Sequence, residues 1–162
     1  MTEQPLSLSL FYKGWDVYQQ RLIEAVAPLT PEQLALRSSP QNWSVGMLAA
    51  HIVATRVWWF QTRMGEGSAD LAPLETWDQN EQPIRPAAEL VEGLERTWQM
   101  IQVALARWTP ADLDQIFPSI GEGTVERSRQ YIIWHVLEHD IHHGGELSSI
   151  LGAHGLAAVD LG

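Results

Sequence analysis

The residues best suited to chemistry are histidines near the end of the chain. Four of the six histidines lie between positions 135 and 143, at His135, His139, His142 and His143. No Pro or Gly interrupts this run, which predicts a helix, and residues four apart on a helix share one face. His139 and His143 should therefore lie one turn apart, a spacing at which two imidazoles can bind one transition-metal ion.

His51 is the expected third ligand, because transition-metal sites usually take three protein ligands. It lies in another predicted helix, among apolar and small residues where an unpartnered polar side chain would be unfavourable. His135 competes with His143 as the partner of His139. The two competitors are eight residues apart, roughly 12 Å along a helix, so they cannot easily share one ion. The residues favour a site formed by His51, His139 and His143.

The remaining histidines, and two known metal-binding motifs, fit this chain less well as a metal site. His142 should lie on a side face of the helix, and His154 should be exposed after its end. The run His139-Asp140-Ile141-His142-His143 differs from the zincin motif H-E-x-x-H by its Asp, which reaches less far than Glu. A di-iron bundle needs Glu three residues before a histidine, and this chain has none. Asp140 or Glu138 could orient an imidazole, although solvated surface positions are the simpler expectation.

The elements that position these histidines are predicted to be helices. Apolar residues recur at helical spacing over residues 7–27, 44–64, 86–105 and 124–152, with Ser44 as an N-cap. In the first segment the apolar stripe is Phe11, Trp15, Tyr18 and Leu22. No segment alternates with period two. The expected fold is therefore all-α, a four-helix bundle formed by one domain over residues 1–162.

The connections are long, which leaves room for a topology other than up-down-up-down. Residues 28–43, 65–85 and 106–123 each exceed what a tight antiparallel connection needs, and 65–85 is expected to be the most mobile. Residues 29–34 and 108–113 both read x-Thr-Pro-x-x-Leu, which predicts two short Thr-capped turns. This repeat suggests a pseudo-twofold arrangement of two helix pairs.

The amino-acid composition argues against several kinds of binding partner and against thiol chemistry by the chain itself. The net charge is −10, and the ten basic residues are scattered, so nucleic acids and anionic membranes are unlikely partners. The chain has no cysteine, which excludes disulfides, thiolate metal ligands and a thiol nucleophile of its own. It has neither a signal-peptide pattern at its start nor an apolar run long enough to cross a membrane. A cytoplasmic protein is expected.

Two motifs together resemble the DinB/YfiT-like superfamily over nearly the whole length. The first is Trp43-Ser44-Val45-Gly46-Met47-Leu48-Ala49-Ala50-His51-Ile52, and the second spans His135 to Leu147. The resemblance implies a four-helix bundle, often a homodimer, with a divalent ion such as nickel, zinc or iron on His51, His139 and His143. The family pattern often has a basic residue and Gln where this chain has Gly144 and Glu146.

The resemblance also implies a chemistry. Some relatives are similar to transferases that present an external low-molecular-weight thiol, such as mycothiol or bacillithiol, to a small electrophile. The alternatives are a hydrolase that uses metal-bound hydroxide and a non-catalytic metal-binding stress protein or sensor. Spacing assigns no catalytic residue. Candidates for polar groups around the open face are Arg56, Arg129 and Tyr131. Trp58, Trp59 and Trp134 could form the wall of a pocket there, although core packing is the simpler expectation for each.

Overall fold

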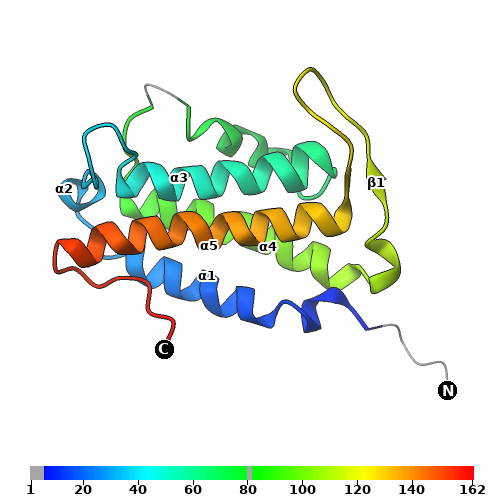
Figure 1. Cartoon of the computed structure of the whole chain (residues 1–162), viewed down its shortest axis with the longest axis horizontal. Helices are drawn as coiled ribbons and strands as arrows, with labels where there is room; N and C mark the ends of the chain where they lie inside the picture. The colour runs from blue at the N-terminus through cyan, green and yellow to red at the C-terminus, as the bar shows by residue number, and fades with distance from the viewer. Residues whose placement is uncertain (1–5, 80–81) are drawn as a thin grey trace.

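The computed structural model describes residues 6–79 and 82–162, and four long helices of this part form a bundle (Figure 1). They are α1 (Lys13–Val26), α3 (Val45–Arg56), α4 (Ala87–Arg107) and α5 (Arg129–Ala153). Both α1 and α3 pack mainly against α4 and α5, so α1 and α3 occupy opposite corners. Figure 1 shows α3 and α4 running in one direction and α1 and α5 in the other. The predicted all-α bundle is confirmed.

The first predicted helix is divided at its start. A 3-10 turn, η1 (Leu8–Leu10), precedes α1, which begins only at Lys13. Trp15, Tyr18 and Leu22 are buried as predicted, but Phe11 is exposed. Phe11 lies in the turn before α1, so the helical stripe begins at Trp15. The prediction that Phe11 belongs to this stripe was wrong.

α3 is the most deeply buried of the four helices. The Ser44 hydroxyl caps it as predicted and accepts the N–H of Met47 at 3.2 Å. The helix continues without a break into η2 (Val57–Arg63), a π-helical segment. Such wider turns are rare and often occur near functional sites. Here the segment carries Trp58 and Trp59.

The last helix begins later than predicted, because a small hairpin precedes it. β1 (Ile116–Phe117) pairs antiparallel with β2 (Arg127–Ser128), so residues 124–128 are not helical. The Arg63 guanidinium donates to the carbonyls of Pro118 at 3.2 Å and Val125 at 2.9 Å, which ties the hairpin to η2. Strands of two residues are too short to produce a period-two pattern.

Both Thr-Pro turns form as predicted. Thr30 caps α2 (Pro31–Leu34) and Thr109 caps η4 (Pro110–Asp112), each with a capping box. The Gln33 side chain accepts the N–H of Thr30 at 2.9 Å, and the Asp112 side chain accepts that of Thr109 at 2.7 Å. Each turn precedes a connection that leads into one of the two helices carrying the histidines.

The segment between η2 and α4 was predicted to be mobile, but its described residues pack on the bundle. It contains η3 (Ala69–Thr76), and it buries Leu71, Leu74 and Trp77 against the core. In Figure 1 it passes over α3 and returns the chain to the end where α4 begins. This crossover allows α3 and α4 to be parallel.

Apolar side chains fill the space between the four long helices. Leu22, Ile52, Leu94, Ile133 and Leu151 are fully buried, and each long helix contributes at least one of them. Within residues 6–79 and 82–162, no helix has both the length and the apolar character that a membrane crossing requires.

Gly144 allows α1 to approach α5 closely. A Cβ atom at this position would lie 2.0 Å from the Tyr18 hydroxyl oxygen. That hydroxyl donates weakly to the carbonyls of Asp140 at 3.3 Å and Ile141 at 3.4 Å. Burial and the nearby Asp140 carboxylate raise the pKa of Tyr18 to about 12, which keeps the hydroxyl protonated as a donor.

Gly144→Ala should lower the free energy of unfolding by about 1–3 kcal/mol, because the new methyl group displaces Tyr18. Gly145→Ala is the matched control, since a Cβ there meets open space. It should stabilise the helix by roughly 0.5–1 kcal/mol. Urea unfolding of both variants measures the difference. Equal effects at the two positions would show that Tyr18 does not require this glycine.

Candidate metal centre

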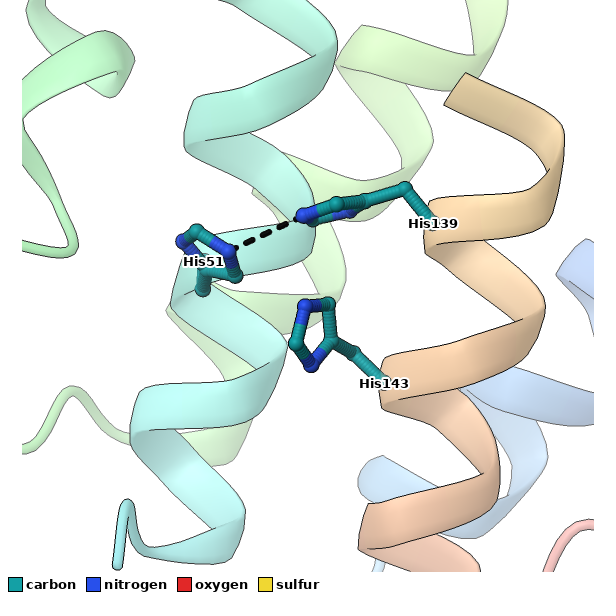
Figure 2. Close-up of side chains that lie close together, drawn as sticks. All are labelled: His51, His139 and His143. Carbon is teal, nitrogen blue, oxygen red and sulfur yellow. Dashed lines mark hydrogen bonds between the residues drawn. The ribbon is translucent and has the colours of Figure 1, made fainter. Parts of the chain in front are cut away.

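The antiparallel helices α3 and α5 bring three imidazoles together (Figure 2). His51 projects from α3, while His139 and His143 project from α5 one turn apart. The Nε2 atoms of His51 and His139 are 3.0 Å apart. One potential ligand atom from each of the three residues lies within 4.8 Å of the other two. The structure therefore brings together the three residues that the sequence predicted as metal ligands.

His135 lies outside this group. Its ring centroid is 6.1 Å from that of His139, whereas the centroid of His143 is 4.3 Å from the same ring. The Nδ1 atom of His135 pairs with Glu138 at 3.1 Å. Glu138 therefore orients an imidazole, but not one of the three that converge. The geometry favours His143 over His135 as the partner of His139.

Carboxylates fix the orientation of two of the three rings. Asp78 Oδ2 lies 2.7 Å from Nδ1 of His51, and Glu146 Oε2 lies 2.6 Å from Nδ1 of His143. A proton on Nδ1 that is donated to a carboxylate leaves the lone pair on Nε2 free for a metal. Figure 2 shows the corresponding nitrogen of each ring facing the centre of the group.

Asp78 is held in place by its neighbour. The Trp77 ring is buried over Gly93 of α4, where a Cβ atom would lie 2.5 Å from the ring. The Arg85 guanidinium covers the same ring at 4.2 Å. The close approach that Gly93 permits therefore sets the position of the carboxylate that contacts His51.

Asp78→Asn should weaken binding of Zn²⁺ by about 10–100-fold, because loss of a carboxylate behind a ligating imidazole typically has this effect. Competition with a chromophoric chelator measures the affinity. Glu75→Gln is the matched control, since its carboxylate bonds to Thr62 rather than to a histidine. An Asp78 variant that binds as tightly as the control would remove the proposed role.

His139 has a strongly lowered pKa. Burial, followed by repulsion from His143 and His51, lowers its pKa from 6.5 to about 3. Its Nδ1 atom is buried and has no hydrogen-bond partner among the described residues, while Thr55 Oγ1 lies 3.4 Å from its Nε2. Metal ligation requires neutral imidazole, and His139 is neutral at pH 7.

These observations fit a metal ion. With Nδ1 of His51 and His143 bound to carboxylates, two Nε2 lone pairs face the Nε2 atom of His139. The Nε2 atoms of His51 and His139 lie 3.0 Å apart, where two lone pairs would repel each other. Either a proton on His139 Nε2 or a bound cation must therefore offset this repulsion. Three neutral imidazoles suit divalent zinc, nickel or iron. The group can therefore hold a divalent transition-metal ion.

The low pKa of His139 should make the stability of the metal-free protein depend on pH. The unfolded chain restores a pKa near 6.5, so between about pH 6.5 and 3 it binds more protons at this position than the folded chain. The free energy of unfolding should therefore fall as the pH is lowered through this window. Urea unfolding at pH 7, 6 and 5 with a chelator present tests this, and His139→Gln should flatten the dependence. An unchanged slope in that variant would contradict the assignment.

A second group of possible ligands overlaps the first. His142, His143 and Glu146 also lie close together, but His142 and Glu146 are exposed. This group would use the Nδ1 side of His143, which is already bonded to Glu146. The His143 ring thus directs Nε2 toward His51 and His139 and Nδ1 toward Glu146. The group of His51, His139 and His143 has the more buried ligands.

Two cavities each border one of the three histidines. The larger has a volume of about 680 Å³ and is lined by His143, Trp43, Arg37, Asn42 and Ser149 among others. The smaller has a volume of about 290 Å³ and is lined by His139, Thr55, Trp58 and Trp59 among others. The Trp43 ring also packs on His51, with centroids 4.4 Å apart. The histidine group can therefore be approached from two sides.

Arg56 was expected near the open face, and this was wrong. Its guanidinium is completely buried and pairs with Asp140 at 2.7 Å. Asp140 was expected on the surface or behind an imidazole, but its carboxylate instead accepts from Arg56 and from Trp15 Nε1 at 2.8 Å. Asp140 follows His139 by one residue, which turns it about 100° toward the core. There the two opposite charges satisfy each other.

Arg129, Tyr131 and Trp134 also lie elsewhere than predicted. Arg129 is buried, donates to the carbonyl of Asp112 at 2.8 Å and packs over Trp108. Tyr131 stacks on His135 and lines neither cavity, and the Trp134 side chain is exposed. Trp58 and Trp59 line the smaller cavity, and Trp59 also packs against the core.

Several residues of the site were not predicted to belong to it. Glu146 and Thr55 could have been found from helical spacing, because they follow His143 by three and His51 by four residues. Trp43 was recognised only as part of a motif. Asp78 lies 27 residues from its partner in a connecting segment, where spacing carries no information.

Comparison with known proteins identifies the family of this fold. A sequence profile of the DinB superfamily matches residues 15–147. The chain belongs to the DinB superfamily. A crystal structure of a DinB-like protein from Bacillus cereus ATCC 10987 covers 98% of this chain and 100% of its own, with a TM-score of 0.73 and 21% identity. The DinB-like protein YjoA from Bacillus subtilis covers 89% and 90%, with a TM-score of 0.61 and 15% identity.

The resemblance seen in the two sequence motifs is thus confirmed. The "uncharacterized protein YrdA" of Bacillus subtilis (strain 168) is 23% identical over 155 residues, which cover 93% of this DinB chain and 84% of YrdA. At these identities the solved structures support the shared fold. The chemistry of this DinB protein has to be argued from its own site.

Proposed function

We propose that this protein is a divalent-metal-dependent transferase that joins an external low-molecular-weight thiol to a small electrophile. His51, His139 and His143 would hold the metal, which we expect to be nickel, zinc or iron. The observation that carries the proposal is the convergence of these three imidazoles at a point adjoined by two cavities.

The donor set supports this chemistry. A divalent ion held by three neutral imidazoles retains its +2 charge and lowers the pKa of a thiol or water that reaches it. Asp78 and Glu146 hold the Nδ1 protons of His51 and His143, which keeps their Nε2 atoms directed inward. The low pKa of His139 keeps the third imidazole neutral at pH 7.

Two cavities beside one group provide room for two reactants. The chain has no cysteine, so any thiol must come from outside. Arg37, Ser38 and Asn42 line the larger cavity and offer polar partners for a thiol cosubstrate. In the reaction, the thiol sulfur forms a bond to an electrophilic carbon, the leaving group departs with its electron pair, and the thiol proton passes to solvent.

We also propose that the protein works as a homodimer in the cytoplasm. Phe11, Val17, Ile141 and Leu161 form an exposed apolar surface between α1 and α5 that suits burial against a second copy. The cytoplasm keeps small thiols reduced. Light scattering on the wild-type protein and on Ile141→Glu tests the assembly, and a monomeric wild type would exclude it.

A hydrolase is the second candidate, because Glu75 lines the same cavity as His139. A carboxylate there could accept a proton from a water molecule that attacks a bound ester or amide. Glu75 bonds to Thr62 and, among the described residues, to none of the three histidines, so nothing fixes it beside a metal-bound water, which is why the transferase is preferred.

One assay separates the two candidates. Protein loaded with Zn²⁺, Ni²⁺ or Fe²⁺ is mixed with 1-chloro-2,4-dinitrobenzene and each of several thiols, and in parallel with 4-nitrophenyl acetate without thiol. A transferase should accelerate thioether formation above the uncatalysed rate only when metal is bound, and His139→Ala should abolish this acceleration. Turnover of the ester without thiol would favour the hydrolase. Absence of both reactions across the panel would count against a catalytic site of this kind.

A further inference from the structure

The smaller cavity has an aromatic and acidic lining. Trp58 and Trp59 come from the π-helical segment η2, and His135 comes from α5. Glu75 and Asp78 approach from the segment that crosses over α3. None of the described residues that line this cavity is Lys or Arg.

The aromatic wall is built before any ligand arrives. The Trp59 ring packs against the Arg63 guanidinium, 5.4 Å from its centroid, and in a T-shaped contact against His135, with ring centroids 4.9 Å apart. Tyr131 stacks on His135 with an interplanar angle of 10°, and Glu138 holds the Nδ1 atom of His135. These contacts fix Trp59 and His135, so a flat ring that enters the cavity does not have to order them.

The two carboxylates are also fixed. Glu75 bonds to the Thr62 hydroxyl and Asp78 to His51, and both are half-buried. Half-buried charges are less screened by solvent than exposed ones. In the metal-free protein the cavity should therefore favour cations over anions, while uncharged molecules meet no electrostatic penalty.

We propose that the smaller cavity is the recognition site for a flat, single-ring molecule that is uncharged or positively charged. This inference rests on the proposed function, since it names the class of electrophile that would meet the thiol beside His139. A volume of about 290 Å³ accommodates one substituted ring, because a cavity of about 150 Å³ already admits benzene.

Three probes of nearly equal shape test the charge preference: benzamidine, benzamide and benzoate. Binding to the metal-free full-length protein at pH 7.5 is followed by NMR of the tryptophan indole N–H signals. Benzamidine should bind at least about tenfold more tightly than benzoate, with benzamide between them. The shifts should be concentrated on the signals of Trp58 and Trp59, which are assigned from the spectra of the Trp→Leu variants.

Matched variants separate the cavity from the overall charge of the protein. Glu75→Gln should reduce the preference for benzamidine, whereas Glu24→Gln on exposed α1 surface, with the same change in net charge, should not. Trp59→Leu should weaken all three probes several-fold, whereas Trp134→Leu, whose side chain is exposed outside both cavities, should leave them unchanged.

Several results would overturn the proposal. They are equal binding of benzoate and benzamidine, identical effects of Glu75→Gln and Glu24→Gln, or loss of binding in Trp134→Leu alone. Circular dichroism confirms that each variant is folded, and Glu75→Gln remains informative if Trp59→Leu is not. Because the measurement uses metal-free protein, ring binding can succeed while metal-dependent transfer fails, or fail while transfer succeeds.

Discussion

Replacing His51 or His139 with alanine should abolish tight binding of a divalent metal while leaving the bundle helical. Each substitution leaves two of the three converging imidazoles, one fewer than transition-metal sites usually use. The loss of affinity should exceed the roughly 100-fold that removal of a residue behind a ligand can produce. Neither side chain belongs to the apolar core, so the free energy of unfolding of the metal-free variants should change little.

Elemental analysis and chelator competition on the purified variants measure the binding, and circular dichroism reports the helices. His135→Ala and His142→Ala are the matched controls, because both lie on the same helix outside the converging group. They should retain most of the affinity. Wild-type occupancy in both His51→Ala and His139→Ala would remove the basis of the metal site. An effect of His135→Ala equal to that of His139→Ala would shift the site along α5.

Helical spacing accounts for what could be predicted of this site. A metal ion bound by α3 and α5 needs ligands on facing stripes, and the spacing of His139 and His143 specifies one stripe. The burial expected for the neighbours of His51 specifies the other, since Leu48 and Ile52 are indeed buried. The capping residues Ser44, Thr30 and Thr109 were equally predictable, because a cap depends on two or three residues that are close in sequence.

Features that depend on distant partners could not be predicted. Arg56 and Asp140 are 84 residues apart, and the sequence around each one alone is typical of a solvated charge on a helix. Asp78 reaches His51 only because Trp77 fits over Gly93. Arg63 holds the hairpin before α5 by donating to the backbone carbonyls of Pro118 and Val125, and no sequence pattern identifies these acceptors. In each case the energy comes from tertiary contacts rather than from local preference.

Arg56→Met is expected to destabilise the protein by about 3–5 kcal/mol, because it leaves the buried Asp140 carboxylate without its opposite charge. The guanidinium is also bonded to Gln19 Oε1 at 2.7 Å and to the carbonyl of Leu94 at 3.2 Å. Urea unfolding of the metal-free protein measures the loss. Arg107→Met is the matched control, since its pair with Glu66 is exposed on the arginine side, and it should change stability by less than about 1 kcal/mol.

The same ion pair should also set the register of the metal site. Arg56 follows His51 on α3 and Asp140 follows His139 on α5, so one buried pair joins the two helices that carry the ligands. Adding Asp140→Asn to Arg56→Met removes the unpaired charge and keeps an acceptor for Trp15, and it should recover part of the lost stability. If the pair sets the register, the double variant should still bind Zn²⁺ more weakly than the wild type although it is folded. Wild-type affinity in a folded double variant would show that packing alone aligns His51 with His139, and that the ion pair contributes only stability.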